Sequence, residues 1–365
     1  MKILILNWRD IKNPAGGGAE ILTHEMAKRW VEMGHEVTQF SSTFPKSKSK
    51  EKIDNVIFKR RGKWWNVHIY AFFYYLRNKN DVDVIIDEVH WFPFFAFLYA
   101  PKKTIALTCE VAGKLLFRIF PYTIALIFLG LEKMYLQFYK TVPTMVISPS
   151  TYADLIATGH KKENVVILPM GITLPKKVKA LKKDSSPTFI SVGRLNIQKG
   201  TVDLIDAFSD IHNTIPNSKL WLVGSGEDAF MKALKEKIRV LHLEDAVILH
   251  GFVTEEEKFA LLSRAHILMS ASAQEGWGLT VPEAGLMKTP SVVYNIEGFR
   301  DIIEQNKTGI LVSKNPKSLS EAVISLLKNK SKYLKMQDAV YKKSLQYSWD
   351  ETAKVSSQFI KNHLS

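Results

Sequence analysis

Short apolar runs alternate with amphipathic stretches over the first forty residues of the chain. Residues 2–7 form a compact apolar run that is typical of a buried strand. Residues 19–33 repeat apolar side chains at helical spacing, and Gly34 follows them as a helix stop. Residues 36–40 then resume a strand pattern. A strand, a glycine-rich loop, a helix and a strand in this order predict a βαβ unit, and therefore a parallel sheet.

The same alternation continues along the chain and restarts once. In the first half, further strands are expected at residues 82–86, 103–108, 144–148 and 165–168. In the second half, strands are expected at residues 188–192, 219–223, 246–250, 267–270 and 291–294, and helices at residues 201–212, 229–241, 255–264 and 282–287. We expect the strand at 291–294 to complete the second core and a last helix to cover residues 352–363.

A change of composition separates the two halves. Residues 174–187 are rich in Lys, Pro and Ser, which predicts a linker. We therefore expect an α/β chain with a first domain at residues 1–173 and a second at 188–348. A chain of 365 residues, 46% of them hydrophobic, is long enough for two full cores. In open α/β sheets, ligands bind beyond the carboxyl ends of the strands, so we expect the candidate site residues there.

The charge of the chain narrows the expected partners. The formal net charge of +14 suits anionic partners, namely membrane lipid, phosphorylated substrates or nucleic acid. No RNA- or DNA-binding motif is present, so we expect no nucleic-acid partner. Lysines cluster at residues 46–63 and 176–183, and a solvated loop is the simpler explanation of each cluster. The one cysteine, Cys109, is compatible with a reducing compartment, and we expect a cytoplasmic protein.

Three aromatic and apolar stretches lie in the first half, at residues 64–76, 91–100 and 115–131. The apolar run within the last of them is too short to span a bilayer. Together with nearby lysines, the stretches suit an enzyme that dips into an anionic membrane surface, peripheral at the inner face of the cell membrane. The alternative is that they form the core of the first domain.

Two glutamates eight residues apart, Glu275 and Glu283, frame a glycine-bearing loop in the second half. Pro282 suits the first position of a helix, and Thr280 and Glu283 have the spacing of a capping box. A helix start suits phosphate, and a carboxylate accepts hydrogen bonds from sugar hydroxyls. The loop therefore suits a ligand that is part anion and part polyol, such as a nucleotide sugar. The alternative is that Glu283 only caps its helix and Glu275 is solvated.

Two cations, Arg194 and Lys199, follow the strand at residues 188–192 and the glycine at position 193. Arg holds phosphate oxygens bidentately and Lys supplies a point charge, so the pair suits a diphosphate. Solvated loop cations are the alternative. Near the N-terminus, Gly17 and Gly18 lie at a predicted helix start and permit close backbone approach to an anion. Their spacing is not that of the dinucleotide fingerprint, and a flexible turn is the alternative.

Other strand ends carry weaker signals. Gly224 and Val253 lie in loops after predicted strands and suit a base pocket, although a tight turn explains either one alone. Asp81 and Asp83 resemble a metal-binding Asp-x-Asp pair, but a strand entry is the simpler explanation. No His/Cys cluster has zinc spacing and no nucleophile elbow is present. We therefore expect neither a metal nor a cofactor.

Taken together, these motifs resemble the large family 4 of retaining glycosyltransferases. The resemblance begins at residues 16–20, continues through residues 147–150 (Ile-Ser-Pro-Ser) and 168–172 (Leu-Pro-Met-Gly-Ile), and runs to Trp349. It implies the GT-B architecture, in which two Rossmann-like parallel-sheet domains face each other across a cleft. It also implies that the helix at 349–365 returns to the first domain.

The resemblance implies a role for each candidate residue. Arg194 and Lys199 would hold the donor diphosphate, Glu283 would bind the ribose, and Glu275 would face the transferred sugar. Gly17 and Gly18 would approach the diphosphate from the first domain. Backbone N–H groups near the sugar and phosphate would come from Gly276, Trp277, Gly278 and Leu279, and the donor would also meet the loops of Gly193, Gly224 and Val253.

One departure from the family pattern concerns the residue after the strand at 103–108. Relatives commonly carry a His there, whereas this chain has Cys109 followed by Glu110. The resemblance implies hexose transfer from a UDP- or GDP-linked donor to a glycan or lipid-linked acceptor, in cell-envelope or polysaccharide synthesis. Transfer would occur with retention and without a metal, with Cys109 and Glu110 near the donor sugar. The alternative is a nucleotide-sugar-binding protein with impaired catalysis.

Overall fold

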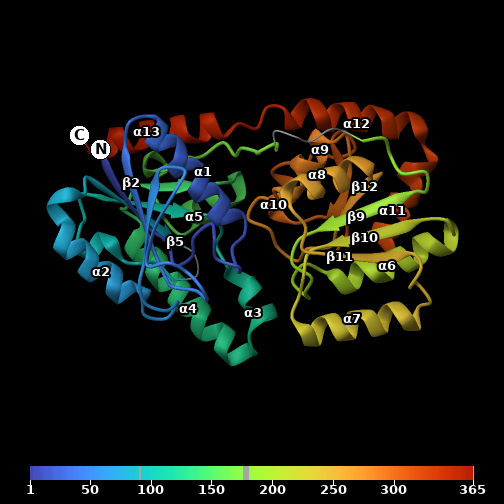
Figure 1. The fold of residues 1–365 in the computed structure, drawn as a ribbon, viewed down its shortest axis with the longest axis horizontal. Coiled ribbons are helices and arrows are strands. Elements are labelled where there is room, and N and C mark those ends of the chain that lie inside the picture. The colour runs from blue at the N-terminus through green and yellow to red at the C-terminus, as the bar shows by residue number, and fades with distance from the viewer. Residues whose placement is uncertain (90–91, 176–180, 365) are drawn as a thin grey trace. The chain divides into compact units, whose positions relative to one another are not determined.

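The chain folds into two compact units, Met1–Gly171 with Ser348–Ser365, and Ile172–Tyr347. The structure, a computed structural model, describes residues 1–89, 92–175 and 181–364 (Figure 1). Residues 176–180 of the predicted linker and its lysine cluster, and residue 91 of one apolar stretch, lie outside the described residues. We call the two parts unit 1 and unit 2 and describe each by itself. Both are built on sheets with helices on their faces, so the predicted α/β class is confirmed.

Unit 1 is built on a sheet with the strand order β3-β4-β2-β1-β5-β6-β7-β8 among the described residues. All neighbouring strands pair parallel except β3 and β4, which pair antiparallel. The strands are β1 (Lys2–Leu6), β2 (Glu36–Ser41), β3 (Lys50–Ile53), β4 (Val56–Arg60), β5 (Val84–Val89), β6 (Thr104–Thr108), β7 (Thr144–Val146) and β8 (Val165–Ile167). The predicted parallel βαβ start and the later strands of this half are confirmed.

The hairpin of β3 and β4 corrects the prediction of a solvated loop at residues 46–63. Asp54 and Asn55 join the two strands with φ angles of 48° and 64°, the positive values that a two-residue hairpin turn requires. Arg60 at the end of β4 is buried, and its guanidinium pairs with the Asp10 carboxylate at 2.6 Å. This lysine-rich segment therefore contributes a paired edge and a buried ion pair to the sheet.

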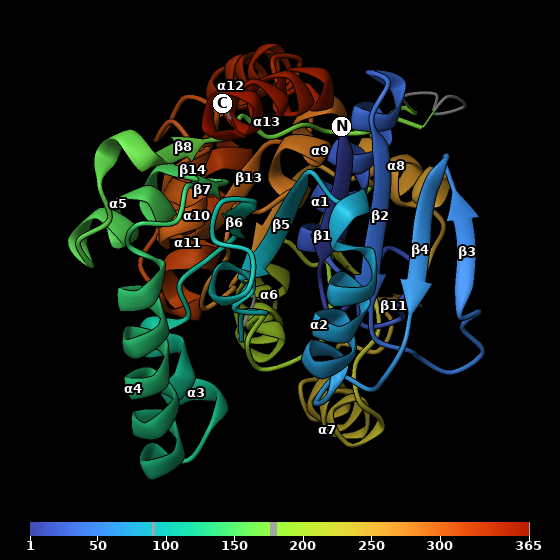
Figure 2. The same cartoon turned by 90° about the vertical axis from the view of Figure 1, so that its left-hand side faces the viewer.

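The helices of unit 1 cover both faces of its sheet (Figures 1 and 2). They are α1 (Gly18–Glu32), α2 (Val67–Asn78), α3 (Leu116–Ile119), α4 (Tyr122–Tyr139), α5 (Pro149–Ala157) and α13 (Trp349–Leu364). Helices α1 and α13 pack together, and the buried indole N–H of Trp30 donates to the Ser356 hydroxyl at 3.1 Å. Among the described helices, none has the length and apolar content that crossing a bilayer requires.

Unit 2 has a fully parallel sheet with the strand order β11-β10-β9-β12-β13-β14. In chain order this is 3-2-1-4-5-6, the order of a dinucleotide-binding Rossmann sheet. Its strands are β9 (Thr188–Val192), β10 (Lys219–Val223), β11 (Val247–Gly251), β12 (Ile267–Ser270), β13 (Ser291–Tyr294) and β14 (Gly309–Val312). The first five confirm the prediction, but β14 adds an edge beyond β13, which we expected to be the last strand.

The helices of unit 2 alternate with these strands. They are α6 (Thr201–Thr214), α7 (Asp228–Val240), α8 (Glu255–Arg264), α9 (Thr280–Leu286), α10 (Glu297–Arg300), α11 (Pro316–Lys328) and α12 (Lys330–Ser344). Helix α6 buries Leu204, Phe208 and Ile211 along one face, which is the apolar stripe that predicted it. The order of strands then reverses between β9 and β12, because the chain adds strands first on one side of β9 and later on the other.

Candidate functional site

A hollow in unit 2 lies beyond the carboxyl ends of β9 and β12, where the strand order reverses. Open α/β sheets bind their ligands at this position. The residues that line this β9–β12 hollow are Ser191, Val192, Gly193, Arg194, Leu195, Lys199, Thr201, Ser270, Ser272, Glu275 and Thr280. The structure thus brings together four of the predicted residues, Gly193, Arg194, Lys199 and Glu275, which are up to 82 positions apart in the chain.

Two glycines fix the path of the loops beside this hollow. Gly193 and Gly224 adopt φ angles of 148° and 128°, which side chains other than glycine rarely adopt. A Cβ atom added to Gly224 would lie 1.9 Å from the carbonyl oxygen of Gly193. The backbone N–H of Gly193 also donates to the carbonyl of Val223 at 2.9 Å. The loops after β9 and β10 therefore pack backbone against backbone, and this contact sets where Arg194 leaves the sheet.

The two cations of the β9–β12 hollow differ in their partners. The ammonium of Lys199 pairs with the Glu275 carboxylate at 2.6 Å, and the Ser272 hydroxyl donates to the same oxygen at 2.8 Å. The guanidinium of Arg194 is exposed, and no ion pair holds it within the part of the chain that the structure describes. An anionic ligand would meet one unpaired cation and would compete with Glu275 for the other.

Glu283 takes a different position from the one that its sequence context predicts. Helix α9 begins at Thr280 with Leu279 as its N-cap, so the predicted capping box and the placement of Pro282 at the first helical position are wrong. The Glu283 carboxylate is buried and accepts from the Lys258 ammonium at 2.9 Å. Burial raises the pKa of Glu283, and its buried Oε2 atom has no hydrogen-bond partner among the residues that the structure describes. Glu283 does not line the β9–β12 hollow.

The remaining predicted residues of unit 2 lie in the loops around α9 and after β11. Trp277 is buried and packs its ring edge-on against Tyr347 at 5.0 Å between centroids. Gly278 has a φ of 90°, and a Cβ atom there would meet the Phe299 ring at 2.6 Å. Gly276 and Val253 are half-buried. The loop from residue 276 to 279 is thus held by packing, which leaves its backbone as the part available to a ligand.

In unit 1 the predicted glycines lie at the start of α1. Gly17 is the N-cap and Gly18 the first residue of the helix. The backbone N–H of Gly17 donates to the Glu20 carboxylate, which also pairs with the guanidinium of Arg9 at 2.8 Å. The glycine loop is therefore tied to the end of β1.

Buried acidic groups surround Cys109 at the carboxyl edge of this sheet. Burial, assisted by nearby carboxylates, raises the pKa of the Cys109 thiol well above its usual range. Glu88 in β5 is buried, and burial raises its pKa to about 8. Its Oε2 atom accepts from Thr23 at 2.8 Å and from the Asn7 amide. Cys109 is therefore a protonated thiol at neutral pH, and its neighbour Glu110 is half-buried.

Sequence reasoning missed Glu88 and Lys258. Glu88 follows Asp87 at the end of an otherwise apolar strand, and two acids inside such a run are a signal for buried carboxyl groups at a strand end. Lys258 gave no signal, because its partner Glu283 lies 25 positions away in the chain and on another helix. The Asp81 and Asp83 carboxylates, considered above as a metal pair, accept from the side chain and the backbone of Lys2 at 2.7 Å each.

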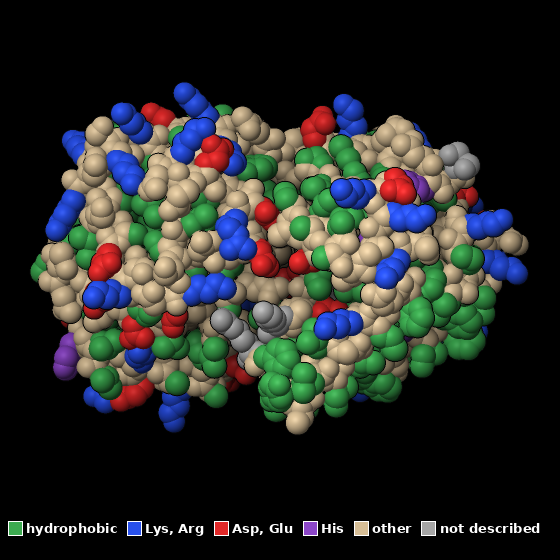
Figure 3. All heavy atoms as spheres, turned by 180° about the vertical axis from the view of Figure 1, so that it is seen from behind, with side chains coloured by type: hydrophobic (Ala, Val, Ile, Leu, Met, Phe, Trp, Pro, Cys, Tyr) green, Lys and Arg blue, Asp and Glu red, His purple; other side chains and the backbone are tan. Residues whose placement is uncertain are grey.

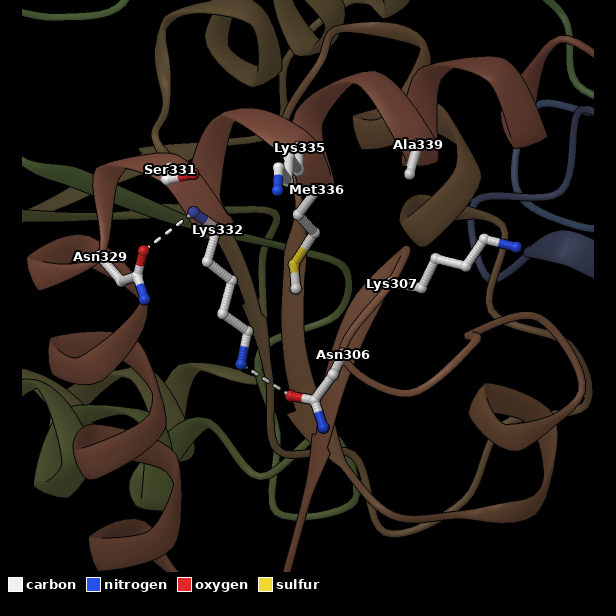
Figure 4. A pocket seen from close by; sticks show the side chains of 8 residues that line it. All are labelled: Asn306, Lys307, Asn329, Ser331, Lys332, Lys335, Met336 and Ala339. Atoms are coloured by element: carbon white, nitrogen blue, oxygen red, sulfur yellow. Dashed lines mark hydrogen bonds between the residues drawn. The ribbon is translucent and has the colours of Figure 1, made fainter.

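A second hollow in unit 2 lies at the start of α12 and contains none of the predicted residues (Figure 4). We call it the α12 hollow. Lys332 donates through its ammonium to the Asn306 side chain at 2.9 Å, and its backbone N–H donates to the Asn329 side chain at 2.9 Å. These contacts are those of a helix cap and its neighbouring turn. The candidate ligand site of unit 2 is therefore the β9–β12 hollow.

Two family models match consecutive parts of the chain. Residues 16–175 match the model described as Glycosyltransferase Family 4, and residues 174–343 match the model described as Glycosyl transferases group 1. Together the two matches cover both units. They include the glycine loop at the start of α1 and every residue named above in the β9–β12 hollow.

Individual relatives are similar in sequence to part of this chain. The poly(glycerol-phosphate) alpha-glucosyltransferase of Bacillus subtilis is 26% identical over 220 residues, 60% of this chain. The alpha-monoglucosyldiacylglycerol synthase of Acholeplasma laidlawii is 28% identical over 186 residues, 47% of this chain. The matched parts span 32% and 46% of these relatives' own lengths.

A solved structure shares the whole fold. Anabaena HepE in complex with UDP-glucose superimposes with a TM-score of 0.74 at 16% identity, over 99% of this chain and 100% of that one. This likeness concerns the fold alone. With both family models matched in succession on two parallel-sheet units, the chain belongs to the family 4 glycosyltransferases of the GT-B fold.

Proposed function

We propose that the protein is a retaining glycosyltransferase that moves a hexose from a UDP- or GDP-linked donor to a glycan or lipid-linked acceptor. The observation that carries the proposal is the meeting of Arg194, Lys199 and Glu275 in one hollow at the switch point of the unit 2 sheet. The relatives support the acceptor class, because their names include a poly(glycerol-phosphate) and a glycolipid product. The bound UDP-glucose of Anabaena HepE supports a nucleotide-sugar donor. Such chemistry belongs to cell-envelope or polysaccharide synthesis.

The proposed role of the cations follows from where charge develops. As the bond between the sugar and the diphosphate breaks, negative charge grows on the leaving phosphate. Arg194 has no ion pair among the described residues and is available for this charge, and Lys199 exchanges Glu275 for a phosphate oxygen. The exchange leaves Glu275 beside the sugar, where its carboxylate accepts from a hydroxyl. Preorganised charge of this kind is often the largest catalytic contribution.

Retention follows from attack on the face from which the diphosphate departs. The anomeric carbon loses its bond to the phosphate oxygen and gains a bond to the acceptor oxygen. The proton of the acceptor hydroxyl passes to the leaving diphosphate. This route uses no protein nucleophile. The thiol of Cys109 is buried and protonated, so it is a poor nucleophile. The two cations supply the positive charge that a metal provides in other transferases.

The test of the proposal is the Lys199→Ala variant. We expect product formation to fall about 10²–10³-fold, because one of the two charges on the leaving group is removed. Stability should change little, because the Lys199 side chain is partly exposed. Lys232→Ala, which removes an exposed lysine on α7, is the matched control. Unchanged turnover of Lys199→Ala with a working donor and acceptor would show that the phosphate-clamp assignment is wrong.

One observation favours a second candidate, a nucleotide-sugar-binding protein with impaired catalysis. Cys109 occupies the position where the family resemblance implies a His, and its thiol is buried. Calorimetric titration with UDP- and GDP-linked hexoses measures binding, and a product assay with the same donors measures transfer. Binding without transfer or donor hydrolysis favours the second candidate, whereas turnover of any donor rejects it. The same screen identifies the base and the sugar.

A further inference from the structure

Most of the large hydrophobic side chains that are exposed in the described structure fall between residues 64 and 138 of unit 1. Figure 3 shows hydrophobic side chains gathered over the helices of this unit, at the lower right of the view. Single exposed hydrophobic residues are normal, but a large contiguous group marks an interaction surface.

Helix α2 presents one exposed apolar stripe. Ile69 and Phe73 are 59% and 48% exposed and lie one turn apart, and Trp65 precedes them by another turn at 61%. The opposite face carries Val67 and Ala71, which are fully buried in the core of unit 1. The helix is thus apolar on both faces, although one of them is largely exposed in the described structure.

Helix α4 repeats this arrangement. Ile127 and Phe138, on one face, are 63% and 55% exposed, whereas Leu136 and Tyr139, on the other, are buried. Residues 92–99, between β5 and β6, join the two helices through aromatic contacts. Phe92 contacts His68 of α2 at 5.5 Å between ring centroids. Phe95 contacts both Phe92, at 5.2 Å, and Tyr139 of α4, at 6.2 Å.

We call the exposed sides of α2, α4 and residues 92–99 the apolar face. Its charges have one sign. The sequence contains neither Asp nor Glu from residue 55 to residue 80. The one acid of α4, Glu132, is buried on the far side of the helix. Lys63, Arg77 and Lys133 are exposed, and no ion pair to any of them occurs among the described residues.

We propose that the apolar face docks the enzyme on an anionic lipid bilayer, at the inner face of the cell membrane. Apolar and aromatic side chains beside unpaired cations are the pattern of helices that lie in a lipid interface. Each such cation adds attraction to an anionic leaflet. A second copy of the chain is a poorer occupant, because two faces of the same positive charge repel each other.

Helix α4 of the apolar face is also joined to the segment that carries Cys109 and Glu110. The buried carboxylate of Glu132 accepts the backbone N–H groups of Ala112 and Gly113 at 2.7 Å each. A lipid-linked acceptor reached from the bilayer would therefore arrive beside residues that the helix holds in place. Only this last step rests on the proposed function, because docking itself is independent of the reaction.

Flotation with two kinds of vesicle tests the docking. The full chain should float with vesicles of phosphatidylcholine and phosphatidylglycerol, less with phosphatidylcholine alone, and less again as salt is raised. Ile127→Glu should weaken flotation with the anionic vesicles about tenfold, because it removes an exposed apolar side chain that would enter the bilayer and adds a charge that the anionic lipid repels. Val240→Glu, at a matched exposure of 60% on α7 of unit 2, should float like the wild type.

Further measurements distinguish a loss of docking from misfolding, from self-association and from failure of the proposed function. Phe73→Glu should repeat the loss from α2, and a circular dichroism melt of each variant shows that it is folded. The proposal is overturned if the wild type does not float, if Ile127→Glu and Val240→Glu float alike, or if light scattering shows a dimer that Ile127→Glu dissociates while flotation is unchanged. Donor hydrolysis without vesicles reports on the proposed function alone. If the protein turns over the donor but does not float, the docking proposal is wrong. If it floats but does not turn over the donor, the proposed transferase function is wrong.

Discussion

At the scale of single residues, Glu88 is a buried group of unit 1 whose protonation is coupled to folding. Burial raises the pKa of Glu88 from an ordinary value of 4.5 to about 8. Between these two values the unfolded chain releases the proton and the folded chain keeps it. The folded state then binds more protons than the unfolded state, so the free energy of unfolding falls as pH rises from about 4.5 to about 8.

The Glu88→Gln variant tests this linkage. Gln has the shape of a protonated Glu, and its oxygen still accepts from Thr23 and Asn7. We expect the variant to match the wild type in urea unfolding at pH 5 and to be more stable at pH 8, by an amount on the order of a few kcal/mol. Glu163→Gln, at an exposed position, is the control. Equal stability of the variant and the wild type at pH 8 would show that Glu88 is ionised in the folded chain.

Residue types at strand ends were predictable, but their partners were not. Arg194, Lys199 and Glu275 were identified because each lies in a glycine-bearing loop after a predicted strand, and parallel strands bring such loops to one edge. The ion pair between Lys199 and Glu275 was not predictable, because it joins residues 76 positions apart. The partner of Glu283 was not predictable for the same reason, and only its expected role as a helix cap is wrong. Its local spacing indicated a cap, whereas its carboxylate pairs with Lys258 from another helix.

At the scale of elements, the contact between the loops after β9 and β10 depends on Gly224. Gly224→Ala places a Cβ atom 1.9 Å from the Gly193 carbonyl, and the φ of 128° strains the new side chain as well. We expect the free energy of unfolding to fall by more than about 2 kcal/mol. The dissociation constant for the preferred nucleoside diphosphate should rise about tenfold, because the contact between the two loops sets where Arg194 leaves the sheet after β9. Urea unfolding and calorimetric titration measure the two effects.

Gly34→Ala separates backbone strain from the steric contact. Gly34 has a φ of 87°, but a Cβ atom there meets nothing within 4 Å. This variant should lose about 1 kcal/mol of stability and keep its nucleotide affinity. If Gly224→Ala behaved in the same way as Gly34→Ala, the backbone contact would have no part in shaping the β9–β12 hollow.

Elements whose apolar side chains are buried were predicted well, and elements with exposed apolar faces were not. Strands β9, β10 and β12 and helix α8 agree with the expected boundaries, because glycine, proline or a change of period marks both ends. Helices α2 and α4 were only recognised as apolar stretches. The exposed faces of these helices are apolar as well, so their sequences lack the alternation of apolar and polar faces by which a helix is recognised. The hairpin of β3 and β4 was not predicted, because charged side chains on both of its faces obscure the alternation that is typical of a strand.

At the scale of the whole molecule, two parallel sheets followed from the alternation of strands and helices, but strand order did not. Alternation fixes only that consecutive strands run parallel. The order β11-β10-β9-β12-β13-β14 depends on which edge each strand joins, and β14 joined an edge that we expected to be free. The reversal between β9 and β12 is therefore a structural result, and it is the reversal that locates the candidate site.

Amide hydrogen exchange over the whole chain tests that location without any substitution. UDP or GDP, whichever binds, should stabilise the protein by about 2.7 kcal/mol at a hundredfold excess over its dissociation constant. Exchange should slow most at residues 191–201 and 270–280, which line the β9–β12 hollow. Residues 329–336 of the α12 hollow (Figure 4) are the internal control, since lysines there also attract anions. Protection confined to residues 329–336 would mean that nucleotide binding follows surface charge and not the strand-order reversal, and the donor assignment would then be wrong.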